Sequence, residues 1–350
     1  MSNDKQPSLV SSILVFIVTI VLLAGLLEVF LVIKNGDGKN YDIEMWKYSR
    51  ELKRISANPN LGHEHIPNKS AKLQNVDIHI NSFGMRGAEP NPQADLKILC
   101  MGSSITFGWG VDEDKIYPEL LKKDLNTFIA ENPGAAVILS SRSERKDPGK
   151  NSASNDFSVD VMNAGIGNYN TVREVELFLT KYKDLKPNVI ILGSFIRDPE
   201  IIPAPKRNWL LENSQLAVTL WSRFEQFKRA SGLESSFEQH YKNIYKDDYE
   251  GWIKTQEAYK KLADYAKANN IRVIVAMIPD IHNLHNYPFI YIHEKVRLLA
   301  EANGFEFIDL YDSFSTIETQ EEIWAMPGDP HPNALGHKLI GEQILNYLVQ

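Results

Sequence analysis

The stretch LKILCMGSSITFG, residues 96–108, joins an apolar run to a turn of glycine, serine and threonine. The apolar run, residues 96–101, has the length and composition of a buried strand. In open α/β folds, the polar side chains that follow such a strand lie at the carboxyl edge of the sheet, where ligands bind. Ser104 is therefore a candidate nucleophile, provided that a base elsewhere in the chain reaches its hydroxyl.

Around this stretch, apolar runs alternate with amphipathic segments. The five runs expected to be strands are residues 97–101, 159–163, 189–192, 272–278 and 305–310. Amphipathic segments such as 117–130 and 252–268 lie between them, and this order predicts a parallel sheet with helices on both faces. Thr171, followed three residues later by Glu174, has the pattern of a capping box that starts a helix.

Composition excludes some classes of function. The 350 residues include 38 basic and 45 acidic side chains, a formal charge of −7. No basic stripe is interleaved with aromatic residues, so nucleic acid is not an expected partner. Cys100 is the only cysteine, which excludes a disulfide within the chain and suits a small buried hydrophobic side chain.

Residues 9–33 are almost continuously apolar and predict a membrane span. As a helix they extend about 37 Å, against a hydrocarbon core of about 30 Å. A cleaved signal peptide is the alternative, but its apolar region is usually shorter and no small-x-small cleavage site follows. We therefore favour an uncleaved anchor, with Glu28 near the membrane interface.

Orientation is less clearly indicated. Lys5 stands before the span, whereas several Lys and Arg residues follow it, and the positive-inside rule read literally keeps the main domain in the cytoplasm. Long domains often override that rule. We expect a single-pass membrane protein whose main domain lies outside the cytoplasm.

The predicted organisation has three parts. Residues 1–34 form a tail and transmembrane anchor, 35–95 a juxtamembrane connector with a small accessory module, and 96–350 the catalytic domain. Residues 199–251 interrupt this domain with an aromatic-rich insertion, which either forms a lid over the sheet edge or packs on the domain as a helical insertion. The polar segment 141–156 is expected to be an exposed loop.

A base for Ser104 is found near the other end of the chain. Asp329 precedes a proline, which favours extended backbone, so the side chains of Asp329 and His331 should project to the same side. The carboxylate then orients the imidazole, whose other nitrogen takes the proton of Ser104. A rigid loop that caps the last helix is the alternative interpretation of this segment.

These residues, in this order, resemble the SGNH or GDSL hydrolase superfamily, and more narrowly its bacterial membrane-anchored members linked with polysaccharide O-acetylation. The resemblance covers roughly residues 60–350 and is carried by the Ser104 block and by NSFGMRG (81–87), GWGV (108–111), NAGIGNYNT (163–171) and DPHPNALGH (329–337). It implies a three-layer α/β/α sandwich with a parallel five-stranded sheet. It also implies a Ser104–His331–Asp329 triad.

Two positions depart from the family pattern. Ser103 stands where the family has a mainly structural aspartate, and Arg197 stands where it has an asparagine that donates to the oxyanion. The remaining oxyanion donors implied by the resemblance are the amides of Ser104 and of Gly167 or, by strict register, Asn168. Arginine either stabilises an oxyanion or fills the pocket and abolishes catalysis.

The resemblance predicts a serine esterase or O-acyltransferase, most simply of acetyl groups, acting on a carbohydrate or cell-envelope ester. Such chemistry requires no metal or organic cofactor, and a transferase implies a membrane-bound O-acyltransferase partner as acyl source. The alternative is a catalytically impaired carbohydrate-binding or scaffold protein. Two groups have loose metal-ligand spacing, His63 with His65 and Asp280 with His282 and His285, and their histidines are expected to make ordinary hydrogen bonds.

Overall fold

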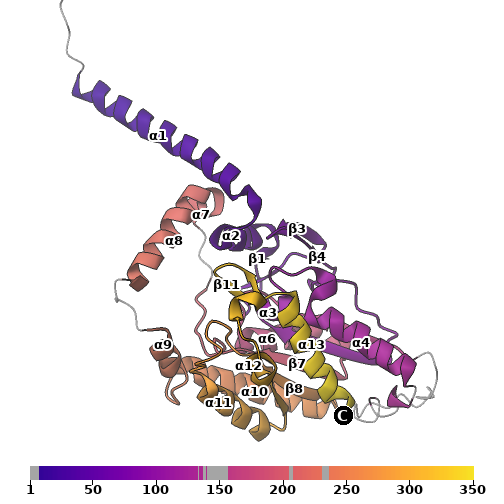
Figure 1. The fold of residues 1–350 in the computed structure, drawn as a ribbon. Coiled ribbons are helices and arrows are strands. Elements are labelled where there is room, and N and C mark those ends of the chain that lie inside the picture. Colours follow the sequence, from indigo (N-terminus) through magenta and orange to yellow (C-terminus); the bar gives the residue numbers. More distant parts are fainter. Residues whose placement is uncertain (1–7, 133, 137–138, 140–156, 205–207, 231–235) are drawn as a thin grey trace, which may run out of the picture. The chain divides into compact units, whose positions relative to one another are not determined.

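The computed structural model describes residues 8–132, 134–136, 139, 157–204, 208–230 and 236–350 (Figure 1). The chain forms two compact units. The smaller comprises Met1–Arg50 and Lys206–Glu234, and the larger comprises Glu51–Pro205 and Ser235–Gln350. The segment 141–156 lies outside the described residues.

The larger unit is built on the predicted parallel five-stranded sheet. Its strands are β5 (Leu96–Gly102), β6 (Val159–Asn163), β7 (Val189–Ser194), β8 (Arg272–Met277) and β9 (Glu306–Asp309). They run in the order β6-β5-β7-β8-β9, and every neighbouring pair is parallel. All five expected strands are therefore confirmed, as is the fold class.

Helices cover both faces of this sheet. The helices of the larger unit include α3 (Ser104–Phe107), α4 (Tyr117–Glu131), α6 (Thr171–Leu177), α9 (Phe237–Ile244), α10 (Glu250–Ala268), α11 (Ile290–Ala302), α12 (Tyr311–Ser315) and α13 (Ala334–Val349). Shorter helical turns are η2 (Glu113–Lys115), η3 (Phe178–Tyr182), η4 (Lys183–Leu185) and η5 (Gln320–Ile323).

Alternating residues of β5 face two separate hydrophobic cores. Leu99 and Met101 pack with α6, α10 and α11 on one face. Ile98 and Cys100 pack with α4, α12 and α13 on the other face. Because successive side chains of a strand point to opposite faces, this division produces the expected three layers.

A small module precedes the sheet. It contains the antiparallel pairs β1 (Lys53–Ile55) with β2 (His63–His65), and β3 (Lys69–Leu73) with β4 (Val76–Ile80). Near the other end of the chain, β10 (Trp324–Met326) pairs with β11 (Asp329–Pro332). Along β4, buried and exposed residues alternate, as expected for a strand with one face on the core.

The predicted capping box at the start of α6 is wrong. Asn170 is the N-cap, and its side chain accepts a hydrogen bond from the Arg173 amide at 3.2 Å. The Thr171 hydroxyl instead donates to Asp198 at 2.9 Å. Glu174 makes no reciprocal bond, because its side chain is buried in the core.

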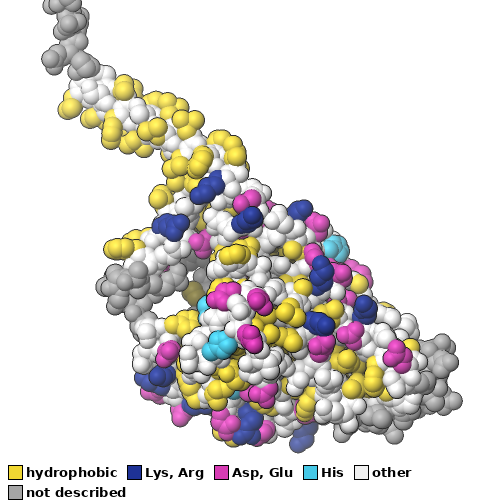
Figure 2. Space-filling model, in the orientation of Figure 1, with side chains coloured by type: hydrophobic (Ala, Val, Ile, Leu, Met, Phe, Trp, Pro, Cys, Tyr) yellow, Lys and Arg dark blue, Asp and Glu magenta, His cyan; other side chains and the backbone are white. Residues whose placement is uncertain are grey.

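The smaller unit contains the helices α1 (Leu9–Lys34), α2 (Tyr41–Glu51), α7 (Trp209–Asn213) and α8 (Gln215–Ala230), with the turn η1 (Asn35–Asp37). Among the described residues, one helical stretch, Leu9–Asp37, is long and apolar enough to cross a membrane, and no residue of its part Leu9–Lys34 is buried. Figure 2 shows hydrophobic side chains along this helix. Such a segment is typical of a single-pass anchor or a signal sequence.

The aromatic-rich insertion contributes to both units. Tyr241 and Tyr245 are buried in the larger unit. The aromatic side chains of α7 and α8 belong to the smaller unit and are exposed. The expectation that the insertion packs on the main domain therefore holds only for its second half, which belongs to the larger unit.

Candidate active site

Ser104 opens the short helix α3, directly after β5 ends. The turn is tight: a Cβ added at Gly102 would lie 2.0 Å from Thr106 Oγ1, and one added at Gly165 would lie 2.2 Å from the Phe107 amide. Only glycine allows the backbone to approach this closely. The amide of Ser104 lies in the first turn of α3, where N–H groups have no partner within the helix.

Arg86 holds the far side of this turn. It is 1 % exposed, and its guanidinium donates to the carbonyls of Phe107, Gly108 and Val111 at 3.0, 2.6 and 2.6 Å. The guanidinium also lies 5.3 Å from the centre of the Phe107 ring. The block at 81–87 therefore braces the turn that carries Ser104, rather than supplying a reacting group.

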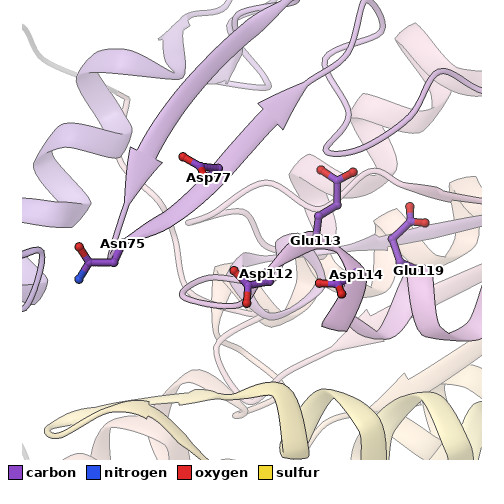
Figure 3. Close-up of a pocket in the computed structure, with 6 residues that line it drawn as sticks. All are labelled: Asn75, Asp77, Asp112, Glu113, Asp114 and Glu119. Carbon is purple, nitrogen blue, oxygen red and sulfur yellow. The ribbon is translucent and has the colours of Figure 1, made fainter.

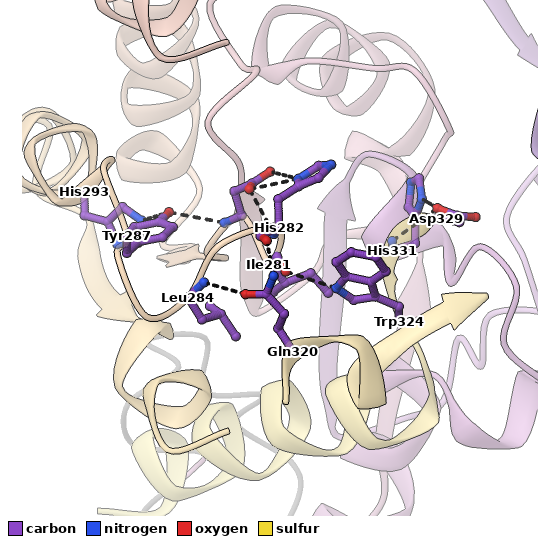
Figure 4. Close-up of polar contacts among 10 residues, drawn as sticks. Ile281, His282, Leu284, Tyr287, His293, Gln320, Trp324, Asp329 and His331 are labelled. Carbon is purple, nitrogen blue, oxygen red and sulfur yellow. Dashed lines mark hydrogen bonds and ion pairs between the residues drawn. The ribbon is translucent and has the colours of Figure 1, made fainter. Parts of the chain in front are cut away.

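The structure brings Ser104, His331 and Asp329 together. Ser104 Oγ lies 2.8 Å from His331 Nε2, and His331 Nδ1 lies 2.5 Å from Asp329 Oδ1. His331 and Asp329 lie on β11, whose extended backbone directs the two side chains to the same side (Figure 4). Because an ionised carboxylate only accepts hydrogen bonds, Nδ1 carries the imidazole proton and Nε2 is free to accept one from the serine.

Two further residues hold the second oxygen of Asp329. Gln74 Nε2 and Trp109 Nε1 donate to Oδ2 at 3.0 and 3.1 Å, and the aspartate is 1 % exposed. Burial raises the pKa of Asp329, but the hydrogen bonds and charge of His331, with the bond from Gln74, outweigh it and leave the pKa below its usual value. The carboxylate is thus kept ionised and oriented.

The sequence analysis missed both of these donors. Trp109 was noted only as part of the GWGV block, and nothing local distinguishes Gln74, which lies in the turn between β3 and β4. A buried tryptophan N–H needs an acceptor, and that requirement was the available indication for Trp109. No comparable indication existed for Gln74.

The loop after β6 carries the candidate oxyanion amides. Asn168 has a φ of 66°, the left-handed conformation that favours glycine, whereas Gly167 does not. The Gly167 carbonyl accepts bonds from Lys53 Nζ at 2.6 Å and from His63 Nε2 at 3.1 Å. Since this carbonyl and the Asn168 N–H belong to one planar peptide, the two donors also set the direction of that N–H.

The surroundings of Lys53 and His63 lower the pKa of both side chains. Burial, with the nearby Arg173 charge, lowers the pKa of Lys53 to about 7. Burial and the Lys53 charge lower the pKa of His63 to about 3. His63 is therefore neutral at pH 7 and donates to the carbonyl through its Nε2–H.

Arg197 lies on the loop after β7 and is paired with an acidic neighbour. Its Nε and Nη2 donate to Glu200 Oε2 at 3.0 and 2.7 Å, and the Arg197 side chain is 54 % exposed. The next residue, Asp198, is buried and accepts bonds from Ser194 and Thr171 at 2.6 and 2.9 Å. Burial raises its pKa to about 6. Two nitrogens of the Arg197 guanidinium thus share one carboxylate oxygen of Glu200.

The other histidines make local contacts. His65 Nδ1 lies 2.9 Å from the Gly84 carbonyl, and His285 Nε2 lies 2.8 Å from that of Glu318. His282 pairs with Asp280 beside Ile281 and Trp324 (Figure 4). His337 is fully buried against Tyr117, and burial lowers its pKa to about 3.

Acidic side chains gather in a hollow of about 450 Å³ on the larger unit. Figure 3 shows its lining, which comprises Asn75, Asp77, Asp112, Glu113, Asp114 and Glu119. None of these is a residue expected in the catalytic site. Over the described ranges, no three His, Cys, Asp or Glu side chains are grouped so as to hold a metal ion.

Comparison with known proteins gives likenesses of fold only. No protein-family model and no curated protein sequence matches the chain. Similar solved structures include LAE5, an alpha/beta hydrolase enzyme from the metagenome of Lake Arreo, at 15 % identity over 73 % of this chain and 95 % of that chain, with a TM-score of 0.43. The acetyl xylan esterase AlAXEase matches at 15 % identity over 72 % and 99 % of the two chains, with a TM-score of 0.40. TesA matches at 12 % identity over 72 % and 98 %, with a TM-score of 0.43.

Proposed function

We propose that this protein is a membrane-anchored serine esterase or O-acyltransferase of the SGNH/GDSL type. Its substrate is an acyl ester, most simply an acetyl ester, of a carbohydrate or another cell-envelope molecule. The observation that carries the proposal is the continuous hydrogen-bonded chain from Ser104 through His331 to Asp329, with distances of 2.8 and 2.5 Å. The two donors on Asp329 Oδ2 support it, because they leave the carboxylate one orientation.

Acylation follows from these contacts. Ser104 Oγ attacks the ester carbonyl carbon while its proton passes to His331 Nε2, and Asp329 stabilises the imidazolium that forms. The oxyanion accepts hydrogen bonds from the amides of Ser104 and Asn168. When the carbon–oxygen bond to the leaving alcohol breaks, His331 returns the proton to that oxygen, and an acyl ester remains on Ser104.

Deacylation repeats these steps with a second nucleophile. His331 removes a proton from water or from an acceptor hydroxyl, which attacks the acyl-enzyme and releases Ser104. Water yields a free acid, whereas a sugar hydroxyl yields a new ester. For the transfer reaction, a membrane-bound O-acyltransferase that supplies the acyl group is the partner implied by the family resemblance.

The membrane anchor in this proposal is α1. Its apolar side chains are exposed along its length, and none of its residues is buried by the rest of the protein. A helix of this kind is stable where lipid covers it. Extraction of membranes with carbonate tests the anchor, since an uncleaved span stays in the pellet.

The catalytic test compares two adjacent serines in the detergent-solubilised full chain. Ser104→Ala is expected to abolish hydrolysis of p-nitrophenyl acetate and labelling by a fluorophosphonate. Ser103→Ala is the matched control. The Ser103 side chain makes no capping bond to α3, so this variant should retain both hydrolysis and labelling. Equal activity in the wild type and Ser104→Ala refutes the enzyme proposal.

A second candidate function is favoured by Arg197. It stands where the family pattern supplies an asparagine donor to the oxyanion, and two of its nitrogens donate to Oε2 of Glu200. On this alternative the protein is a carbohydrate-binding or scaffold protein, and acetylated oligosaccharides bind the wild type and Ser104→Ala equally without turnover. Arg197→Asn separates the two: a rise in kcat shows that arginine limits an active enzyme, whereas no turnover in either variant supports the scaffold.

A further inference from the structure

An apolar face on α7 and α8 of the smaller unit has no cover from the described residues. Its six side chains, here called the α8 face, are between 54 and 74 % exposed. They are Trp209, Leu210, Leu220, Trp221, Phe224 and Phe227. Their exposed surface is roughly 700 Å², whereas the largest apolar patch on a soluble monomer is usually about 300–600 Å². Patches of this size mark contact with another apolar phase or molecule.

The α8 face is one side of an amphipathic helix. Leu220, Phe224 and Phe227 are spaced by four and three residues, so they form a single stripe. Val218, on the other side of the helix, is buried. Lys228 lies at the margin of the stripe, with its ammonium 5.7 Å from the Phe224 ring and paired with Glu225 at 2.9 Å. A lysine placed in this way can cover apolar surface with its stem while its charge stays in a polar layer.

Ser214 and Glu28 of α1 together cap the N-terminus of α8. The Ser214 hydroxyl accepts a hydrogen bond from the Ala217 amide at 3.1 Å. The Glu28 carboxylate accepts hydrogen bonds from the Ser214 hydroxyl at 2.8 Å and from the amides of Gln215 and Leu216 at 2.8 and 2.9 Å. These amides belong to the first turn of α8, where a negative charge is favourable. The only carboxylate within α1 therefore lies at the N-terminus of α8.

The depth of Glu28 places this cap near the edge of the membrane. From Leu9 to Glu28 the helix rises about 30 Å, which equals the thickness of the hydrocarbon core. Starting at that level, α8 runs across the axis of α1 rather than alongside it (Figure 1). A helix that leaves a spanning helix in this way follows the plane of the bilayer surface.

We propose that α7 and α8 lie on the lipid surface beside α1, with the α8 face inserted at the boundary between headgroups and acyl chains. This inference rests on the proposed membrane anchor and adds a second attachment to it. Lipid is favoured over a protein partner because the α8 face adjoins the exposed apolar surface of α1. Tryptophan and phenylalanine bordered by lysine and arginine are also typical of interfacial helices.

The test places fluorescent labels on the full chain reconstituted in vesicles of phosphatidylcholine and phosphatidylglycerol. Phe224→Cys carries the label on the α8 face, and Gln226→Cys, on the opposite side of α8, is the matched control. Val21→Cys carries the label in the middle of α1 and reports the anchor separately. The native Cys100 is fully buried, and burial raises the pKa of its thiol, so it does not compete for the reagent.

Each label is quenched either by spin-labelled lipid or by iodide in water. We expect lipid quenching at 224 to exceed that at 226 several-fold, and iodide quenching to show the reverse order. Phe227→Cys should behave as Phe224→Cys does, which guards against local damage by one substitution. Lipid quenching at 21 without lipid quenching at 224 overturns the inference and leaves the anchor intact, whereas no lipid quenching at 21 refutes the anchor itself. Shielding of 224 from both quenchers means that protein covers the face, and this also overturns the inference.

Discussion

Glu174 on α6 is a buried carboxyl group without a recorded hydrogen bond. It is 1 % exposed, and neither of its carboxyl oxygens has a hydrogen-bond partner among the described residues. Burial first, and the charge of Asp198 second, raise the pKa of Glu174 well above its usual value. The folded protein therefore favours the protonated form of Glu174 more than the unfolded chain does.

The effect of this proton on the free energy of unfolding follows from the linkage between proton binding and folding. An unfolded glutamate has a pKa of about 4.3, so between that pH and the raised pKa of Glu174 the folded state holds a proton that the unfolded state has released. Over that interval the free energy of unfolding falls by about 1.4 kcal/mol for each pH unit. Glutamine has nearly the same shape and cannot ionise, so the stability of Glu174→Gln relative to the wild type should rise with pH at about this rate. The gain should disappear as the pH falls towards 4.5.

Urea unfolding of the detergent-solubilised full chain, followed by near-ultraviolet circular dichroism from acidic to neutral pH, measures this difference. Glu257→Gln, on the exposed side of α10, is the control and should show no such pH-dependent gain. A Glu174→Gln variant that is less stable than the wild type at pH 7 would refute the reasoning. So would a difference that does not change with pH, because either result means that the folded state holds an ionised, well-partnered carboxylate.

Three further predictions concern the candidate site. Asp329→Asn should lower kcat about 10⁴-fold with little change in KM, because an amide at this position favours the wrong imidazole tautomer. Steady-state hydrolysis measures this loss of kcat, and a loss of less than tenfold contradicts the orienting role of Asp329. Lys53→Met removes one of the two donors on the Gly167 carbonyl and should lower kcat by up to about tenfold while KM stays constant, since one hydrogen bond contributes about 0.5–1.5 kcal/mol. Asn168→Gly keeps the left-handed backbone and should retain activity. Asn168→Val introduces a β-branched residue that resists a positive φ, and its kcat should fall about a hundredfold. Equal activities of the two variants would exclude this amide from the oxyanion site.

Much of the fold was predictable because its causes are local. The five sheet strands are short apolar runs, and Leu99 and Ile98 reach opposite cores simply because side chains alternate along a strand. The Asp329–His331 pairing was also local, since an extended backbone brings residues two apart to one side. Ser104 was identified from its position at a strand end. Its proximity to His331 was expected from the sequence, but only the folded chain gives the distance between them.

The remaining features depend on contacts between distant parts of the chain. Gln74 reaches Asp329, and Lys53 reaches the Gly167 carbonyl, although no local pattern pairs them. The capping box was misread for the same reason, because Asp198 takes the Thr171 hydroxyl. The amino-acid sequence by itself determined the strands, the apolar helix and the candidate triad, since periodicity and short spacing act within a few residues. Only the tertiary structure decided which donors surround Asp329, which carboxyl group is buried unpaired and which helix Glu28 caps, because packing selects these partners from the whole chain.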